Sequence, residues 1–152
     1  MKLAAAAFVA VLAAPALAAV VTYDPIYDSG STSLDEVACS NGKNGVETMF
    51  GYKKFKDIPN FPFIGGVPTI KGWNSPVCGS CWQLAYTDPK NSAHTTFINI
   101  TAIDTGNASD DGFNISLEAM NYLTGGKAKQ LGRAQITATR VEPDYCNLGD
   151  TL

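Results

Sequence analysis

Two cysteines separated by two residues form the most reactive pattern in the chain. Cys78-Gly79-Ser80-Cys81 is a C-x-x-C motif, which serves thiol–disulfide exchange in reducing compartments when it lies beside a βαβ unit. Together with Trp82 it also matches C-G-[SA]-C-[WY], the signature around the papain nucleophile. These patterns raise two hypotheses, a redox catalyst and a cysteine protease, and each requires further features elsewhere in the chain.

The chain lacks the features that either hypothesis requires. No βαβ pattern accompanies the C-x-x-C motif, and a papain-like cysteine needs a histidine about 130 to 150 residues downstream, beyond Leu152. The single histidine, His94, follows a polar stretch and is expected in an exposed loop. One histidine also leaves a zinc ion without enough ligands once the thiols are oxidised. We therefore expect no metal, no cofactor and no catalytic residue of these classes.

The first 18 residues predict export. Lys2 supplies a positive charge, residues 3–14 form an apolar run, and the A-L-A sequence at 16–18 fits the A-x-A cleavage rule. The run is shorter than the roughly 20 residues that span a bilayer. We interpret residues 1–18 as a signal peptide and 19–152 as a single secreted, extracellular domain.

Export places all the cysteines in an oxidising compartment, where an even number of them indicates disulfides. Cys39, Cys78, Cys81 and Cys146 allow three pairings. The close spacing of Cys78 and Cys81 favours an arrangement in which each clamps a distant segment, one of them the early Cys39 and the other the late Cys146. Each such bridge stabilises the fold by roughly 3 to 4 kcal/mol in the chain-entropy model.

The charge balance argues against two classes of partner. The net charge is −3 at pH 7 and becomes one unit more negative when Lys2 leaves with the signal. Nucleic acid and anionic membranes select basic surfaces, so neither is expected as the main partner.

Short strand patterns separated by Gly, Pro and Asn predict an all-β barrel or sandwich with two short helices. Strands are expected at 20–23, 46–52, 82–87, 95–104 and 133–141, and helices at 34–39 and 116–123. Ser33 to Glu36 forms a capping box at the first helix, and Gly125-Gly126 ends the second. Residues 55–72 contain several prolines and glycines, so an ordered surface loop is expected there. Such a loop either has a function or only covers one end of the barrel.

Short motifs are spaced through nearly the whole predicted domain, with all four cysteines among them. They are Tyr23-Asp24, Ser33-Leu34, Val37-Ala38-Cys39-Ser40, Ile58-Pro59-Asn60-Phe61-Pro62, Ile64-Gly65-Gly66, Gly72-Trp73-Asn74-Ser75-Pro76, Ile103-Asp104, Gly112-Phe113-Asn114-Ile115, Leu123-Thr124-Gly125-Gly126 and Leu131-Gly132-Arg133. In these stretches the chain resembles the cerato-platanin family of small secreted fungal proteins. It departs from the family at Asn41, where many members have Asp, and in segment 88–95, which is longer than usual and predicts a hairpin extension.

The resemblance implies a double-psi β-barrel, similar to expansins, with disulfides Cys39–Cys78 and Cys81–Cys146. It also implies binding of chitin fragments, expansin-like loosening of polysaccharide without clear hydrolysis, and elicitation of plant defence. The expected partners are chitin or other cell-wall oligosaccharides and a plant host receptor. The expected location is extracellular, including the fungal cell wall.

A sugar-binding groove needs fixed hydrogen-bonding groups and an aromatic face. The candidates are Asp104, Asn114, Tyr23, Asp24, Asn44 and Trp73. Asp104 matches the acidic residue that related barrels place in their groove. Three of the others have a named structural alternative: Asn114 as a turn residue, Trp73 as core, and Tyr23 as packing at a strand end.

Weak glycoside hydrolysis through Asp104 is the alternative function. Hydrolysis normally needs two carboxyl groups, about 5 to 9.5 Å apart depending on the stereochemical outcome. The possible second carboxylates are Asp24, Asp28, Asp110 and Asp111. Asp24 is preferred because it falls at a strand end in the Tyr23-Asp24 motif, whereas Asp110 and Asp111 lie in a loop where solvation is expected.

Three N-x-[ST] sequons occur, at Asn99, Asn107 and Asn114. Asn107 is the preferred glycosylation candidate because it lies in a loop, whereas Asn99 falls inside a predicted strand and a glycan on Asn114 would obstruct the proposed groove. The polar tail 147–152 is expected to fray.

Overall fold

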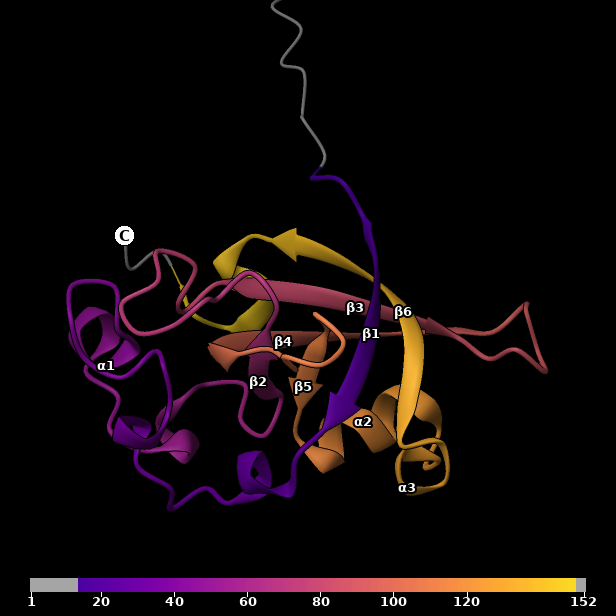
Figure 1. Cartoon of the computed structure of the whole chain (residues 1–152), viewed down its shortest axis with the longest axis horizontal. Coiled ribbons are helices and arrows are strands. Elements are labelled where there is room, and N and C mark those ends of the chain that lie inside the picture. The colour runs from indigo at the N-terminus through magenta and orange to yellow at the C-terminus, as the bar shows by residue number, and fades with distance from the viewer. Residues whose placement is uncertain (1–13, 150–152) are drawn as a thin grey trace, which may run out of the picture.

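The computed structural model describes residues 14–149. Within them, six strands close a barrel in the order β1-β5-β2-β4-β3-β6 (Figure 1). The pairs β1–β5 and β2–β4 are parallel, and the remaining neighbours in the barrel are antiparallel. The strands are β1 Leu17–Tyr23, β2 Ile64–Val67, β3 Cys81–Thr87, β4 Thr95–Thr105, β5 Phe113–Ile115 and β6 Arg133–Val141. The predicted fold class, an all-β barrel with short helices, is confirmed.

Short helical segments connect the strands. The α-helices are α1 Val46–Phe50, α2 Leu117–Thr124 and α3 Ala128–Leu131, and 3-10 turns occur at Pro25–Asp28, Leu34–Glu36, Phe55–Asp57 and Pro143–Cys146. The helix predicted at 116–123 is confirmed as α2. Ser116 caps it by accepting a hydrogen bond from the backbone N–H of Ala119, and Gly125 ends it in the left-handed conformation. Helices α2 and α3 lie together at one end of the barrel (Figure 1).

Both predicted disulfides are present, Cys39–Cys78 and Cys81–Cys146. The first joins the segment after β1 to the loop before β3. The second joins the start of β3 to the turn that follows β6. Each cysteine of the C-x-x-C motif therefore clamps a different distant segment, so no free thiol remains for redox or nucleophilic chemistry among the described residues.

Four of the five predicted strands are confirmed, because 20–23, 82–87, 95–104 and 133–141 lie within β1, β3, β4 and β6. The strand predicted at 46–52 is wrong: α1 occupies Val46–Phe50. Gly45 precedes this single turn of helix, and Gly51 ends it with φ 76°. The apolar residues of the segment suggested a strand, but the two flanking glycines leave room for only one helical turn.

The helix predicted at 34–39 is shorter than expected and is a 3-10 turn over Leu34–Glu36. Ser33 caps this turn as predicted, by accepting from the N–H of Asp35. The chain then becomes extended at Val37, because the next two backbone N–H groups bind the end of β4. Ala38 donates to the side chain of Asp104, and Cys39 donates to the carbonyl of Ile103.

The prediction of an irregular surface loop over 55–72 is wrong in its centre, which contains β2. All four residues of Ile64–Val67 are buried between β4 and β5. A Cβ on Gly65 would lie 2.3 Å from the carbonyl oxygen of Asn114, and one on Gly66 would lie 1.9 Å from that of Thr105. The two glycines, which suggested a loop, are therefore what allows this strand to fit.

The predicted hairpin extension projects from the barrel between β3 and β4 (Figure 1). Lys127 anchors its base through an ion pair of 2.8 Å with Asp88, and His94 is exposed as predicted.

The prediction of a frayed tail is wrong at Leu148, which is 3% exposed and packs against the Cys81–Cys146 bridge. Residues 150–152 lie outside the described part.

Most of the predicted signal peptide, residues 1–13, also lies outside the described part. Strand β1 begins at Leu17, so two of its residues, Leu17 and Ala18, precede the predicted cleavage point after Ala18, and both are exposed. Cleavage there would remove the first two residues of β1 without opening the core. No helix within residues 14–149 is long and apolar enough to cross a bilayer.

Candidate functional site

A row of polar side chains crosses four neighbouring strands of the barrel. Thr22 of β1 pairs with Asn114 of β5, Asn114 pairs with Gly66 of β2, and Gly66 pairs with Asp104 of β4. Three strand spacings of about 4.8 Å give the row a length of roughly 14 Å. We call Thr22, Asn114 and Asp104 the polar row. All three are half-buried, whereas their neighbours Val21, Phe113 and Ile103 are buried in the core.

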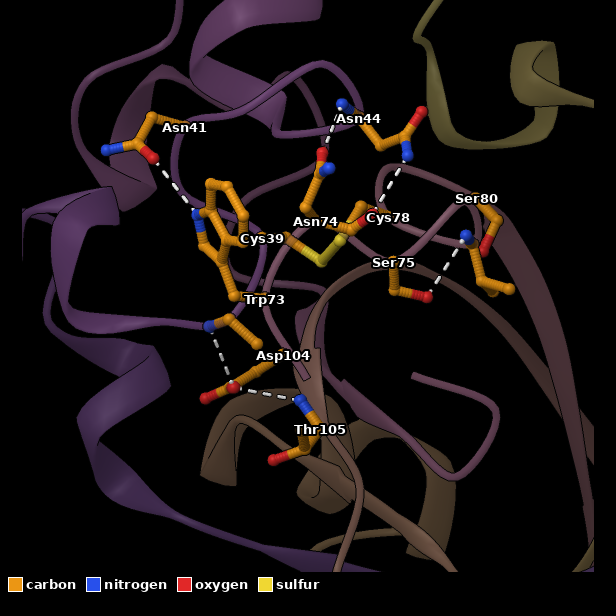
Figure 2. Close-up of a disulfide and its surroundings, with 12 residues drawn as sticks. Cys39, Asn41, Asn44, Trp73, Asn74, Ser75, Cys78, Ser80, Asp104 and Thr105 are labelled. Atoms are coloured by element: carbon orange, nitrogen blue, oxygen red, sulfur yellow. Dashed lines mark hydrogen bonds between the residues drawn. A yellow bond between two sulfur atoms is a disulfide. The ribbon is translucent and has the colours of Figure 1, made fainter. Parts of the chain in front are cut away.

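The carboxylate of Asp104 is held by three donors of the protein itself. Its Oδ1 accepts from the backbone N–H groups of Ala38 and Thr105, at 3.1 and 2.8 Å (Figure 2). Its Oδ2 accepts from the hydroxyl of Tyr27 at 3.0 Å. The side chain therefore joins the end of β4 to two segments that precede it by more than 60 residues.

The Tyr27 hydroxyl binds one predicted carboxylate, that of Asp104, at 3.0 Å. Tyr27 is 4% exposed, and burial raises its pKa above the ordinary range. The negative charge of Asp104, its hydrogen bond and the more weakly acting charge of Asp24 raise the pKa further. Asp24 itself is exposed and accepts from the N–H of Ile26 at 2.9 Å, which caps the 3-10 turn at Pro25–Asp28.

The raised pKa of Tyr27 predicts a loss of stability in alkali. A folded-state pKa above the unfolded value of 10.0 means that the unfolded chain loses this proton first as the pH rises. The contribution of Tyr27 to the free energy of unfolding is therefore complete below pH 10. Above pH 10 this contribution declines, with a slope that approaches about 1.4 kcal/mol per pH unit. Urea unfolding between pH 8 and 11 should show this decline in the parent protein and a shallower one in Tyr27→Phe. Equal slopes would contradict it.

Asn114 belongs to a short chain of hydrogen-bonded side chains. The Thr22 hydroxyl lies 3.0 Å from Asn114 Oδ1 and 3.2 Å from the carbonyl of Phe113, so it has a choice of acceptors. The same hydroxyl oxygen accepts from Nδ2 of Asn107 at 3.2 Å. Tyr23 follows Thr22 in β1, pairs with Ile115 and packs half-buried against the core. Four of the six predicted residues, Tyr23, Asp24, Asp104 and Asn114, are therefore linked through adjacent strands and turns.

The other two predicted residues, Asn44 and Trp73, form a separate cluster beside the Cys39–Cys78 bridge (Figure 2). Asn44 is bound to Asn74 twice, through its backbone N–H at 2.9 Å and its Nδ2 at 2.8 Å. Trp73 is 62% exposed, so its alternative assignment to the core is wrong. Its Nε1 donates to Asn41 at 3.0 Å, and its ring lies over Gly42. Within residues 14–149 no hydrogen bond joins this cluster to the polar row.

A cavity of about 350 Å³ lies beside Asn107, which donates to Thr22 of the polar row. Thr105, Gly106 and Asn107 form one side, Pro68 and Ile70 form another, and an exposed ion pair between Lys71 and Asp111 lies at its edge.

The two carboxylates of the β4–β5 loop, Asp110 and Asp111, were predicted to be solvated. The prediction holds for Asp111 but is wrong for Asp110, which is partly covered and pairs with Arg133. No group of three metal-ligating side chains occurs in the described part of the chain.

The polar row presents hydroxyl, amide and carboxylate groups, which are hydrogen-bonding partners for hydroxyls and amides, and both predicted carboxylates are bound within the protein. Both oxygens of Asp104 accept from donors of the protein, and Asp24 is used as a cap. A general acid must instead direct a proton at the leaving oxygen of a bound substrate. Sequence reasoning missed Tyr27, which binds Asp104 across 77 residues of sequence, and Thr22, which joins the row through the pairing of β1 with β5. Neither residue type suggests a site without these remote contacts.

Comparisons with known proteins agree with the fold. The cerato-platanin family model matches residues 19–148. A heat-stable 19 kDa antigen of Coccidioides immitis is 42% identical over 148 residues, which is 96% of this chain and 94% of the antigen.

Solved structures give the same result. The crystal structure of cerato-platanin 1 from M. perniciosa superimposes with a TM-score of 0.78 at 39% identity, over 85% of this chain and 99% of that one. The solution structure of the fungal elicitor cerato-platanin does so with a TM-score of 0.69 at 34% identity, over 88% and 99%. The chain belongs to the cerato-platanin family.

Proposed function

We propose that this protein is a secreted, non-catalytic binder of cell-wall oligosaccharides, with chitin oligomers as ligands of the polar row. Expansin-like loosening of the wall and elicitation of plant defence through a host receptor would follow from that binding. The fungal cell wall and the space around it are the proposed location, reached through the predicted signal peptide 1–18. One solved relative is described as a fungal elicitor, which supports the last part of the proposal.

The polar row itself is the observation that supports binding. It places an amide, a hydroxyl and a carboxylate in a line of roughly 14 Å, about the length of a few sugar rings. N-acetylglucosamine offers hydroxyl and acetamide groups that match such donors and acceptors. The cavity, which Pro68 and Ile70 line in part, lies beside Asn107 at the Thr22 end of the row, so a chain of sugars lying along the row would meet both polar and apolar surface.

A titration of the oxidised protein with GlcNAc hexamer, followed by NMR, tests the proposal. We expect saturable amide shifts around Thr22, Asn114 and Asp104 while the sugar stays intact. Asn114→Ala should weaken binding about tenfold, equivalent to about 1.4 kcal/mol. This variant is informative because the Thr22 hydroxyl retains the Phe113 carbonyl as an acceptor, so folding should change little.

Asn91→Ala at the exposed tip of the hairpin is the matched control and should bind like the parent. Shifts confined to the Trp73 cluster would move the proposed site there. An absence of any shift would overturn chitin binding, and shortened oligomers would replace the proposal by hydrolysis. Plant responses to Asn114→Ala separate the receptor function: a retained response would show that elicitation uses another surface.

A further inference from the structure

One of the three sequons differs from the others in its surroundings. Thr101, the hydroxyl residue of the Asn99 sequon, is 1% exposed and donates to Asn60 at 2.6 Å. Ser116, in the Asn114 sequon, is 0% exposed and caps α2. In the folded chain only the Asn107 sequon keeps its hydroxyl residue on the surface.

The Asn107 sequon lies in a tight turn between β4 and β5. The backbone N–H of Asn107 donates to the carbonyl of Gly112, and the N–H of Gly112 donates back to the carbonyl of Asn107. Ser109 is exposed, and its hydroxyl donates to Asn107 Oδ1 at 2.6 Å. The turn therefore presents the sequon in a defined orientation at the edge of the barrel.

Asn107 also contacts the polar row directly. Its Nδ2, the atom to which an N-linked glycan is attached, lies 3.2 Å from Thr22 Oγ1. That oxygen lies 3.0 Å from Asn114 Oδ1. Asn107 also lines the cavity that Thr105, Pro68 and Ile70 form. A sugar on Nδ2 would therefore start beside Thr22, at one end of the surface proposed to bind oligosaccharide.

We propose that Asn107 carries an N-linked glycan whose own core occupies the polar row and inhibits binding of external chitin oligomers. The inference rests on the proposed function. A eukaryotic N-glycan begins with two β1,4-linked N-acetylglucosamine units, the same disaccharide that repeats in chitin. The glycan is therefore a tethered copy of the ligand as well as a bulky group.

The modification itself is an ordinary transfer within the secretory pathway. A lipid pyrophosphate-linked oligosaccharide is the donor. A bond forms between Nδ2 of Asn107 and C1 of the first sugar, and the bond from C1 to the pyrophosphate oxygen breaks. Nδ2 loses one proton, the lipid pyrophosphate leaves, and the second N–H remains free to donate to Thr22.

Tethering makes even a weak disaccharide an effective competitor. A short flexible link gives an effective concentration in the millimolar range. If the disaccharide binds the row with a dissociation constant below that range, external oligomers lose about fivefold or more in apparent affinity. The loss should be specific to a glycan at this position.

The experiment compares three forms of the full chain produced in a glycosylating eukaryotic host and titrated with GlcNAc hexamer. They are the parent protein, S109A, which loses the sequon, and S109A combined with A93T, which creates a sequon at Asn91 on the exposed hairpin tip. Peptide mass spectrometry establishes which asparagine is modified. Amide shifts of Thr22 and Asn114 are compared between the parent and S109A before any sugar is added.

We expect mass spectrometry to find a glycan on Asn107 of the parent protein. Without added ligand, the Thr22 and Asn114 amide signals of the parent should be shifted from those of S109A. The parent should bind GlcNAc hexamer about fivefold more weakly than S109A. The form with the glycan at Asn91 should bind like S109A. An unmodified Asn107, equal affinity in all forms, or equal weakening by a glycan at Asn91 would overturn the inference. If S109A binds no hexamer, the proposed function fails instead, and the amide shifts without ligand still report whether the glycan lies on the row.

Discussion

Replacing Asp104 with alanine is expected to lower the free energy of unfolding by about 3 kcal/mol, because two covered donors lose their acceptor. The Tyr27 hydroxyl belongs to a buried residue and the N–H of Ala38 to a half-buried one, and both bind this carboxylate, whereas Thr105 is exposed and can bind water instead. Urea unfolding of the oxidised protein at pH 7 measures the loss directly.

Two further variants test this explanation. Asp104→Asn keeps an acceptor oxygen and should lose less stability than the alanine variant. Combining Tyr27→Phe with Asp104→Ala should cost less than the sum of the two single changes, because both remove the same hydrogen bond. Additive losses, or an alanine variant as stable as the parent, would show that the bonds around Asp104 contribute little.

This result also affects how binding experiments are interpreted. A loss of sugar binding in Asp104→Ala would not show that the carboxylate contacts sugar, since the same change releases the segments that carry Tyr27 and Ala38. Asn114→Ala is the better probe of the polar row, because its neighbour Thr22 has a second acceptor.

Removing the Cys39–Cys78 bridge by replacing both cysteines with alanine should cost about 4 kcal/mol in unfolding free energy. The bridge closes a loop of 39 residues between two buried cysteines. It also holds the loop that carries Trp73 and Asn74 against the segment that carries Asn41 and Asn44. The variant should therefore lose the fixed position of Trp73 as well as stability, and indole fluorescence would report both.

The second bridge provides the comparison. Cys81–Cys146 closes a loop of 65 residues, and the chain-entropy model gives it nearly the same contribution, again about 4 kcal/mol. Its removal should leave the environment of Trp73 unchanged in the native state. If the first variant lost less than about 1 kcal/mol, or if both changed Trp73 alike, the separate role of the first bridge would be contradicted.

The parts of the fold that the sequence predicts best are those whose local pattern and tertiary environment agree. In β6 the alternation of Ala134, Ile136 and Ala138 with polar residues reflects one buried face, and the structure keeps it. In α2, Ser116 and Gly125 mark the ends by capping. These signals are local, so they can be read without knowing what packs nearby.

The misread elements depend on contacts that are remote in sequence. Gly65-Gly66 is typical of a loop and becomes a strand only because the backbones of β4 and β5 approach it closely. The segment after Glu36 leaves its helical turn because the end of β4 binds Ala38 and Cys39. Neither partner can be identified from the local pattern.

The same limit applies to the candidate site. Asp104, Asn114, Tyr23 and Asp24 were identified through family motifs, and the structure connects them. Trp73 belongs to an equally clear motif, but it lies with Asn44 in a different cluster, because motif matches carry no information about distance in space. Tyr27 lies in no such motif, although its hydroxyl organises the site.

Closure of the barrel has a consequence for how the protein is made. β1 pairs with β6 from Leu17 opposite Ala138 to Thr22 opposite Arg133, so the first strand synthesised needs the last one as its neighbour. β3 depends on β6 in the same way. During translation both strands therefore have an unpaired edge until the C-terminal segment emerges, and such edges promote aggregation. A nascent chain halted before residue 133 would be unable to seal the barrel, which makes completion of synthesis a precondition for folding.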